Sequence, residues 1–229
     1  NPFDVLAVAD YGDVDFVSGY PDQAVEVIEA HARQLLAEDV TMVTFGGDHF
    51  VTYPLLKAHA EKYGPLALIH FDAHVDTWPD DGDQLDHGSM FLRAVREGLI
   101  DPHCSVQIGI RSFSEDDYGF TVMSSPWVAE NGVRATILEI QRVVGRRKAY
   151  LTFDIDCLDP AFAPGTGTPV AGGLSSLEAL TIVRALGKID LVGMDVVEVA
   201  PAYDQAEITA IAAATLAHDF ICLKAWQKK

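Results

Sequence analysis

The segment Leu66-Ala-Leu-Ile-His-Phe-Asp-Ala-His-Val-Asp76 joins an apolar run to an alternating series of polar side chains. Its first six residues have the length and residue types of a buried strand. In an extended backbone every second side chain points to the same side, so Asp72, His74 and Asp76 converge. A single Asp after a strand is often a turn or helix-capping residue, but turns do not require this alternation. The segment therefore predicts a strand that ends in a metal-binding motif.

Two further apolar runs end in the same manner. Residues 149–153 precede Asp154-Ile-Asp156, and residues 41–45 lead into Gly46-Gly-Asp-His49. Four carboxylates in one place repel each other strongly unless a cation lies among them. We therefore predict a cage for two metal ions, formed by His49, Asp72, His74, Asp76, Asp154 and Asp156.

The donor set of this cage indicates the metal and the chemistry. Carboxylate oxygens favour Mg²⁺ or Mn²⁺, and two imidazoles move the choice toward Mn²⁺, with Zn²⁺, Co²⁺ and Fe²⁺ left open. Two such ions about 3.5–4 Å apart acidify a shared water near neutral pH. We therefore expect a hydrolytic enzyme with two Mn²⁺ per chain.

Apolar, β-rich runs alternate with amphipathic stretches along the whole chain. Strands are expected at 3–8, 41–45, 66–71, 105–110, 149–153 and 191–197, and helices at 21–38, 53–63, 88–98, 133–144, 175–186 and 207–226. This alternation predicts a three-layer α/β fold, in which a mostly parallel central sheet carries helices on both faces. Ligands of such sheets bind beyond the carboxyl ends of the strands, where all six proposed ligands lie. Residues 1–229 are expected to form one domain.

The net charge of −18 comes from 34 acidic residues against 16 Lys and Arg. Such a surface repels nucleic acid and anionic membranes and attracts a small cationic substrate. The three cysteines, Cys104, Cys157 and Cys222, are far apart and fit reduced thiols in a cytoplasmic protein. No apolar run approaches the roughly 20 residues of a membrane span, so we expect no membrane association.

Several motifs of this chain resemble those of the ureohydrolases, the arginase and agmatinase family. They are Gly46-Gly-Asp-His49, Asp72-Ala-His-Val-Asp76, Asp154-Ile-Asp-Cys-Leu-Asp-Pro160 and Gly165-Thr-Gly-Thr-Pro169. Residues 86–91, 108–111 and 195–205 look most like those of bacterial agmatinases. The resemblance implies an arginase-like fold, two Mn²⁺, hydrolysis of a guanidinium to urea and an amine, and a homo-oligomer, either a trimer or a hexamer. It also leads us to expect that residues 1–229 are the catalytic domain without the family's N-terminal segment.

The resemblance also assigns roles to individual residues. It identifies the same six side chains as metal ligands and gives Asp76 a catalytic role as well. It makes His87 the proton shuttle and Glu198 the partner of the substrate guanidinium, with which a carboxylate forms a bidentate charged pair. Asp86 and Thr168 are expected beside the substrate. The remaining histidines are interpreted as structural, namely His31, His59, His70, His103 and His218.

The segment from Thr77 to Asp86 bears on the choice of guanidine. It contains four Asp and neither Asn nor Ser, the residues that hold the α-carboxylate and α-amino group of arginine in arginases. Four acids repel a carboxylate and attract an ammonium group, so agmatine is the expected substrate. Two alternatives remain open: a ureohydrolase for another guanidine such as guanidinobutyrate, and a truncated, inactive metal-binding form.

Overall fold

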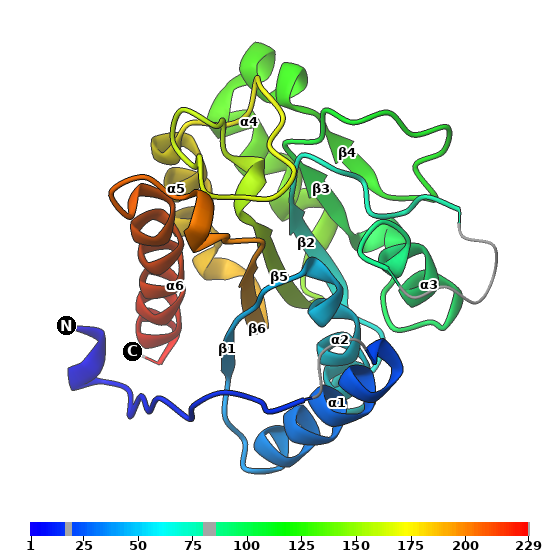
Figure 1. Cartoon of the computed structure of the whole chain (residues 1–229), viewed down its shortest axis with the longest axis vertical. Coiled ribbons are helices and arrows are strands. Elements are labelled where there is room, and N and C mark those ends of the chain that lie inside the picture. Colours follow the sequence, from blue (N-terminus) through cyan, green and yellow to red (C-terminus); the bar gives the residue numbers. More distant parts are fainter. Residues whose placement is uncertain (17–19, 80–85, 229) are drawn as a thin grey trace.

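The computed structural model describes residues 1–16, 20–79 and 86–228. Its centre is a sheet in which the described strands run in the order β1-β6-β5-β2-β3-β4 (Figure 1). Every pairing between neighbouring strands is parallel. The strands are β1 (Met42–Phe45), β2 (Ala67–Phe71), β3 (Val106–Ile108), β4 (Thr121–Met123), β5 (Lys148–Asp154) and β6 (Asp190–Val197).

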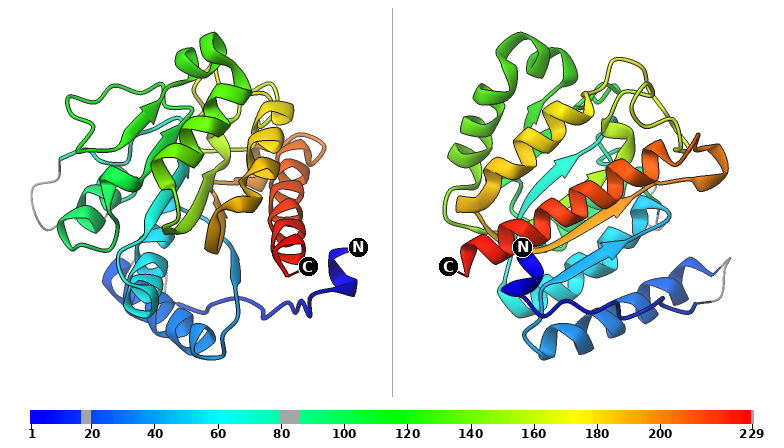
Figure 2. Two further views of the ribbon diagram at one scale, coloured as in Figure 1. Left: turned by 180° about the vertical axis from the view of Figure 1, so that it is seen from behind. Right: turned by 90° about the vertical axis from the view of Figure 1, so that its left-hand side faces the viewer.

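Helices cover both faces of this sheet (Figure 2). They are α1 (Pro21–Ala37), α2 (Thr52–Tyr63), α3 (Met90–Arg96), α4 (Ser125–Val144), α5 (Ser176–Arg184) and α6 (Ile208–Gln227). Side chains of α1, α2 and α3 pack into one hydrophobic cluster, and those of α4, α5 and α6 into another. Alternate residues of one strand enter different clusters: Leu68 joins the first and Ile69 the second. The predicted three-layer α/β fold is confirmed.

Short 3₁₀ helices complete the described elements. They are η1 (Pro2–Asp4), η2 (His49–Val51), η3 (Pro102–Cys104), η4 (Ile155–Cys157), η5 (Ala185–Lys188) and η6 (Pro201–Tyr203). Two of them matter for the site, because η2 follows β1 and η4 follows β5 directly. His49 opens η2 and Asp156 lies in η4, so both residues stand at the carboxyl edge of the sheet. A capping box between Ser175 and Glu178 opens α5.

The structure differs from the secondary structure expected from the sequence in three places. The strand expected at 3–8 is absent: Asn1 caps the 3₁₀ helix η1, and residues 6–16 lie largely exposed without a strand partner among the described residues. The strand β4 was missed, because three residues are too few to show a clear period. Residues 125–131 were not expected to be helical: Gly132, where φ is 82°, separates them from the expected helix at 133–144, and α4 contains both segments. Asn131-Gly132 reads in the sequence as a break between elements.

The C-terminal helix α6 is long and apolar enough to cross a membrane by length and composition alone. The sequence prediction that no segment has this property was therefore too strict. Leu216 and Phe220 of this helix are buried in the cluster that α6 shares with α4 and α5. The core helix of a globular protein passes the same test, so α6 is weak evidence for a membrane.

A buried imidazole in α2 makes the fold sensitive to acid. His59 is fully buried, and its Nδ1 lies 2.8 Å from the carbonyl oxygen of Leu55, while its Nε2 has no hydrogen-bond partner. Burial lowers the pKa of His59 from 6.5 to about 4. The unfolded chain therefore binds this proton between pH 6.5 and pH 4, and the folded chain does not. The free energy of unfolding is therefore unaffected by the titration of His59 above pH 6.5, and it decreases as the pH falls from 6.5 toward 4.

We expect the variant His59→Leu to lose less stability than the wild type between pH 6.5 and pH 4. The difference should approach about 3 kcal/mol, at about 1.4 kcal/mol per pKa unit. Urea unfolding at a series of pH values gives both slopes, and the carboxylates of the metal centre cancel in the comparison. Parallel slopes for the two proteins would show that His59 does not titrate differently in the folded chain.

Candidate metal centre

The end of β2 delivers the first ligand candidates. The Asp72 side chain is fully buried, and its Oδ1 accepts a hydrogen bond of 2.6 Å from the backbone N–H of His74. Asp76 is 5% exposed, and its φ of 49° turns the chain away from the strand direction. The side chains of Asp72, His74 and Asp76 thus lie close together, as the alternation predicted. The backbone that carries them is no longer a strand, because β2 ends at Phe71.

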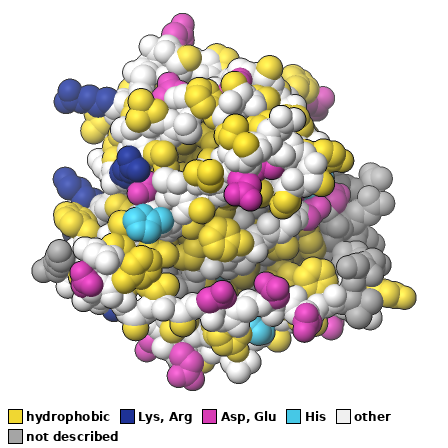
Figure 3. Space-filling view, turned by 60° about the vertical axis from the view of Figure 1, so that its left-hand side comes forward, with side chains coloured by type: hydrophobic (Ala, Val, Ile, Leu, Met, Phe, Trp, Pro, Cys, Tyr) yellow, Lys and Arg dark blue, Asp and Glu magenta, His cyan; other side chains and the backbone are white. Residues whose placement is uncertain are grey.

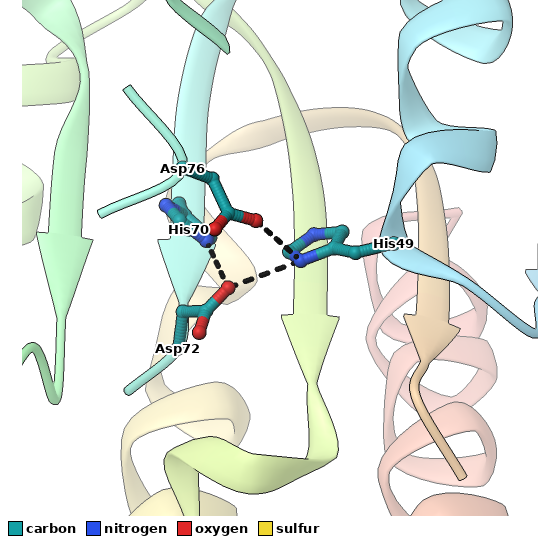
Figure 4. Close-up of side chains that lie close together, drawn as sticks. All are labelled: His49, His70, Asp72 and Asp76. Atoms are coloured by element: carbon teal, nitrogen blue, oxygen red, sulfur yellow. Dashed lines mark hydrogen bonds and ion pairs between the residues drawn. The ribbon is translucent and has the colours of Figure 1, made fainter. Parts of the chain in front are cut away.

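One group of ligand candidates surrounds His49. The Nδ1 atom of its ring lies 3.0 Å from Oδ2 of Asp72, 3.1 Å from Oδ2 of Asp76 and 3.2 Å from Oδ2 of Asp154. Figure 4 shows the ring pointing toward Asp72 and Asp76. This buried nitrogen nevertheless makes no aligned hydrogen bond to any of the three oxygens. It points between them, as a nitrogen ligand does toward a cation that the carboxylates share.

A second group surrounds His74. Its Nδ1 lies 3.0 Å from Oδ2 of Asp156 and 3.3 Å from Oδ1 of Asp72. Asp72 thus offers one oxygen to each histidine. The residues present therefore fit two adjacent cation sites that share one carboxylate, and the structure brings all six predicted ligands together.

The electrostatics of these groups call for positive charge. Burial, followed by the charges of Asp72 and Asp156, raises the pKa of Asp154 well above its ordinary value. Burial and the charge of Asp72 also raise the pKa of Asp76. Burial opposes ionisation of Asp72 too, but the charge of His70 and the close approach of the imidazoles of His49, His70 and His74 lower its pKa well below 3.8. A divalent cation would favour the ionised form of every member of the group.

The loop after β5 is fixed by main-chain contacts. Asp156 Oδ1 accepts a hydrogen bond of 3.0 Å from the N–H of Ala73, which joins this loop to the end of β2. The guanidinium of Arg111 donates to the carbonyl oxygens of Asp156 at 2.6 Å and Val170 at 2.7 Å. It also donates to the carbonyl oxygens of Gly109, Cys157 and Leu158. This clamp holds both ends of the segment 156–170, including Thr168, whose hydroxyl lies 3.4 Å from Oδ2 of Asp156.

Outside the buried groups lies a more open cluster of Asp48, His87 and Glu198. The Nδ1 atom of His87 lies 3.0 Å from Oδ2 of Asp48 and 4.0 Å from Oε1 of Glu198. The hydrogen bond to Asp48, opposed by partial burial, raises the pKa of His87 to about 9. At neutral pH this imidazole therefore carries a proton that it can give away. Asp48 was not among the predicted site residues, although it immediately precedes His49.

Glu198 is connected directly to the first group. Its Oε1 accepts a hydrogen bond of 2.6 Å from the N–H of His49, and its own N–H donates to the carbonyl of Gly47 at 2.8 Å. Its φ of 62° is the left-handed conformation, which costs a non-glycine residue roughly 1–2 kcal/mol. Burial raises the pKa of Glu198. A strained and partly buried carboxylate at the end of β6 is typical of a functional position.

The structure also brings in His70, which the sequence analysis interprets as structural. Its Nε2 lies 2.7 Å from Oδ2 of Asp72, and its Nδ1 lies 3.2 Å from the amide nitrogen of Gln107. Both ring nitrogens are therefore engaged, and His70 orients Asp72 rather than offering a free lone pair. The alternation along β2 contains the signal, because His70 and Asp72 are two residues apart and share a side of the strand.

Asp86 is the predicted site residue with the weakest connection to the metal-ligand candidates. It is exposed, and its Oδ1 accepts a hydrogen bond of 3.0 Å from the hydroxyl of Ser89 at the start of α3. Among the residues that the structure describes, it makes no ion pair or hydrogen bond with the metal-ligand candidates. The other acids of the predicted acidic segment, Asp80, Asp81 and Asp83, lie outside the described residues.

A parallel sheet with buried carboxylates and imidazoles at its carboxyl edge is the architecture of an α/β metal-dependent hydrolase. Comparison with known proteins gives the family. The model of the arginase family matches residues 1–222. An agmatinase of Chromobacterium violaceum is 62% identical over 225 residues, which are 97% of this chain and 70% of that protein. The chain belongs to the arginase family.

Solved structures agree with this assignment. A hypothetical agmatinase from Burkholderia thailandensis superimposes with a TM-score of 0.97 at 62% identity, covering 99% of this chain and 73% of that one. Proclavaminate amidino hydrolase from Streptomyces clavuligerus superimposes with a TM-score of 0.94 at 38% identity, covering 99% and 78%. The resemblance identified from the motifs is confirmed.

We expect the purified chain, dialysed against Mn²⁺ and then against buffer, to retain two ions, and the variant Asp72→Asn to lose both. Asp72 has an oxygen near each histidine, so its substitution weakens both sites. Elemental analysis measures the stoichiometry. Asp86→Asn removes an exposed acid of the same type and should leave the content unchanged. Two ions retained by Asp72→Asn would contradict the shared position of this carboxylate.

Proposed function

We propose that this chain is an agmatinase that hydrolyses agmatine to putrescine and urea. The placement of Glu198 carries the proposal: it is a carboxylate beside the six ligand candidates, held by the N–H of His49 and next to the imidazole of His87. A carboxylate in this position suits a guanidinium, which it binds through two parallel charged hydrogen bonds. The name agmatinase given to relatives at 55–62% identity supports the same substrate.

The surroundings of the site also favour a cationic substrate. Asp48, Asp76 and Glu198 all lie near His87. The nearby guanidinium of Arg111 donates to backbone carbonyls of the loop 156–170. Figure 3 shows acidic side chains spread over one face of the molecule, with Lys and Arg gathered at one side of the view. With a net charge of −18, this surface attracts agmatine, which carries a guanidinium and an ammonium group.

The reaction adds water to the guanidinium carbon, and the bond from that carbon to the alkyl nitrogen breaks. Two divalent ions, when bound by the six ligands, supply Lewis acidity and activate water near neutral pH. Glu198 holds the guanidinium so that its carbon faces the buried carboxylates. Asp76 accepts a hydrogen bond from the attacking water, and Thr168 contributes a hydroxyl at the rim. His87, which is protonated at neutral pH, gives its proton to the leaving amine, and the two protons that the water loses on becoming the urea oxygen pass to His87 and to the amine.

The proposed metal, oligomeric state, domain organisation and cellular location each rest on a different observation. Mn²⁺ as the metal rests on the mixed carboxylate and imidazole donors. A homo-oligomer, as a trimer or hexamer, and a single catalytic domain over residues 1–229 rest on the resemblance to the family. A cytoplasmic location rests on the three free cysteines, Cys104, Cys157 and Cys222. Asp86 is proposed to attract the ammonium end of agmatine from its exposed position.

We expect agmatine to exceed both arginine and guanidinobutyrate in kcat/KM by more than about 10-fold. The carboxylates of arginine and guanidinobutyrate would lie beside the acidic side chains of the site, and like charges placed together cost several kcal/mol. Urea release from the three guanidines, with Mn²⁺ and with a chelator, tests this order. Rising salt should reduce the advantage of agmatine if long-range attraction contributes. A higher kcat/KM for guanidinobutyrate would identify the chain as a ureohydrolase for that compound, and no release from any guanidine would identify an inactive metal-binding form.

We expect Glu198→Gln to lower kcat/KM for agmatine on the order of 10²-fold, because the amide keeps an acceptor for the N–H of His49 but loses the charge that faces the guanidinium. His87→Asn should lower kcat by about 10²–10⁴-fold, the span of a general acid–base group. Both variants should keep the wild-type metal content, which elemental analysis measures alongside the kinetics.

The exposed acid Glu115 provides a matched control, because Glu115→Gln makes the same change of charge at a side chain outside the set of ligand candidates. It should turn over agmatine at the wild-type rate. Loss of a metal ion from His87→Asn would make His87 a ligand. A wild-type rate for Glu198→Gln would place the guanidinium elsewhere.

A further inference from the structure

A buried carboxylate in β6 has no place in the chemistry described above. Asp195 is fully buried in the middle of this strand. Its Oδ2 accepts hydrogen bonds of 2.9 Å from the hydroxyls of Thr52 and Tyr150, and its Oδ1 accepts one of 2.6 Å from Thr152. These donors come from α2 and from β5. Burying a carboxylate among apolar side chains is costly even when it is well bonded, so its presence calls for a reason beyond packing.

One of the three hydroxyls leads to the metal centre. The Oγ1 atom of Thr152 lies 2.9 Å from Nε2 of His49. A threonine hydroxyl has one hydrogen, and Thr152 gives it to Asp195. Its oxygen can therefore only accept from His49, so Nε2 must carry the hydrogen of the ring. The other nitrogen, Nδ1, then presents its lone pair to the point between Asp72, Asp76 and Asp154, where a cation would lie.

We propose that Asp195 and Thr152 are positioning residues that fix His49 as the tautomer able to bind metal through Nδ1. This inference rests on the metal centre of the proposed function and adds a relay from Asp195 through Thr152 to His49. Phe91 also packs edge-on against the ring of His49, with centroids 5.4 Å apart. Hydrogen bonds to the second nitrogen of a metal-binding histidine raise its basicity and hold its orientation.

The alternative is that Asp195 and its three hydroxyl donors have a purely structural role. Substitution of Thr52 distinguishes this role from the positioning role. Thr52 donates to the same carboxylate as Thr152 and is equally buried, but its hydroxyl faces Thr152 at 3.4 Å and makes no hydrogen bond with His49. Removing either hydroxyl leaves Asp195 one donor short. Only the removal of Thr152 takes the acceptor from His49. The two variants therefore share the loss of stability and differ at the metal.

The test compares Mn²⁺ binding by the chelator-treated wild type and the variants Thr152→Val, Thr152→Ser and Thr52→Val in isothermal titration calorimetry. Thr152→Val should weaken one of the two ions by about 10–100-fold, the usual effect of losing such a partner. Thr152→Ser keeps the hydroxyl and should restore the affinity. Thr52→Val should bind both ions like the wild type. Urea unfolding of each metal-free protein measures the stability that Thr152→Val and Thr52→Val lose alike.

Equal weakening of metal by Thr152→Val and Thr52→Val would make the cluster structural and overturn the proposal, as would wild-type affinity in Thr152→Val. A second measurement needs no variant: ¹⁵N shifts of the histidines in the Zn²⁺-loaded wild type should show hydrogen on Nε2 of His49, and hydrogen on Nδ1 overturns the relay. Neither readout uses a substrate. A protein with this metal behaviour but no urea release would refute the proposed agmatinase activity alone.

Discussion

Mutual repulsion among buried carboxylates is the constraint on which the rest of this structure depends. Asp72, Asp76, Asp154 and Asp156 end two neighbouring strands and meet with almost no exposed surface. Burial and neighbouring charge raise the pKa of Asp154 well above its ordinary value and also raise that of Asp76, so these two carboxyl groups alone would resist ionisation. The fold tolerates the arrangement because every carboxylate is also held by backbone N–H groups or imidazoles, and because bound cations would balance the charge. The centre is thus built to be completed by metal.

The residues around the ligand candidates restrict the orientations that the ligand side chains can adopt. His70 and Gln107 leave Asp72 one orientation, and the N–H of Ala73 does the same for Asp156. Asp76 and Glu198 sit in left-handed backbone conformations that the surrounding chain must impose. Gly46 allows the chain after β1 to pack closely against the end of β6. A Cβ at this position would lie 2.7 Å from Cγ2 of Val51 and 2.9 Å from Cγ1 of Val197. Such preorganisation lets a site bind ions without first rearranging.

The sequence predicted the layers of the fold and the gathering of the six ligand candidates, because both depend on local periodicity. Apolar runs of strand length, each followed by polar residues at alternate positions, place those residues at one edge of any parallel sheet. What it could not predict depends on contacts between distant segments. Asp195 and Thr152 look like ordinary polar residues inside strands, and their link to His49 exists only once α2, β5 and β6 are packed. The expected strand at 3–8 failed for the same reason, since a strand needs a partner that the local pattern does not reveal.

The clamp formed by Arg111 recognises the segment 156–170 entirely through its main chain. Backbone carbonyl groups do not titrate and are the same for every amino acid, so the anchorage is independent of the side chains that the segment displays. The side chains of this rim can therefore be exchanged while its path beside the ligands is kept. For protein engineering, this separates the shape of the entrance from its chemistry: amidino compounds with different tails could be selected by redesigning residues 161–170 on an unaltered metal-binding scaffold.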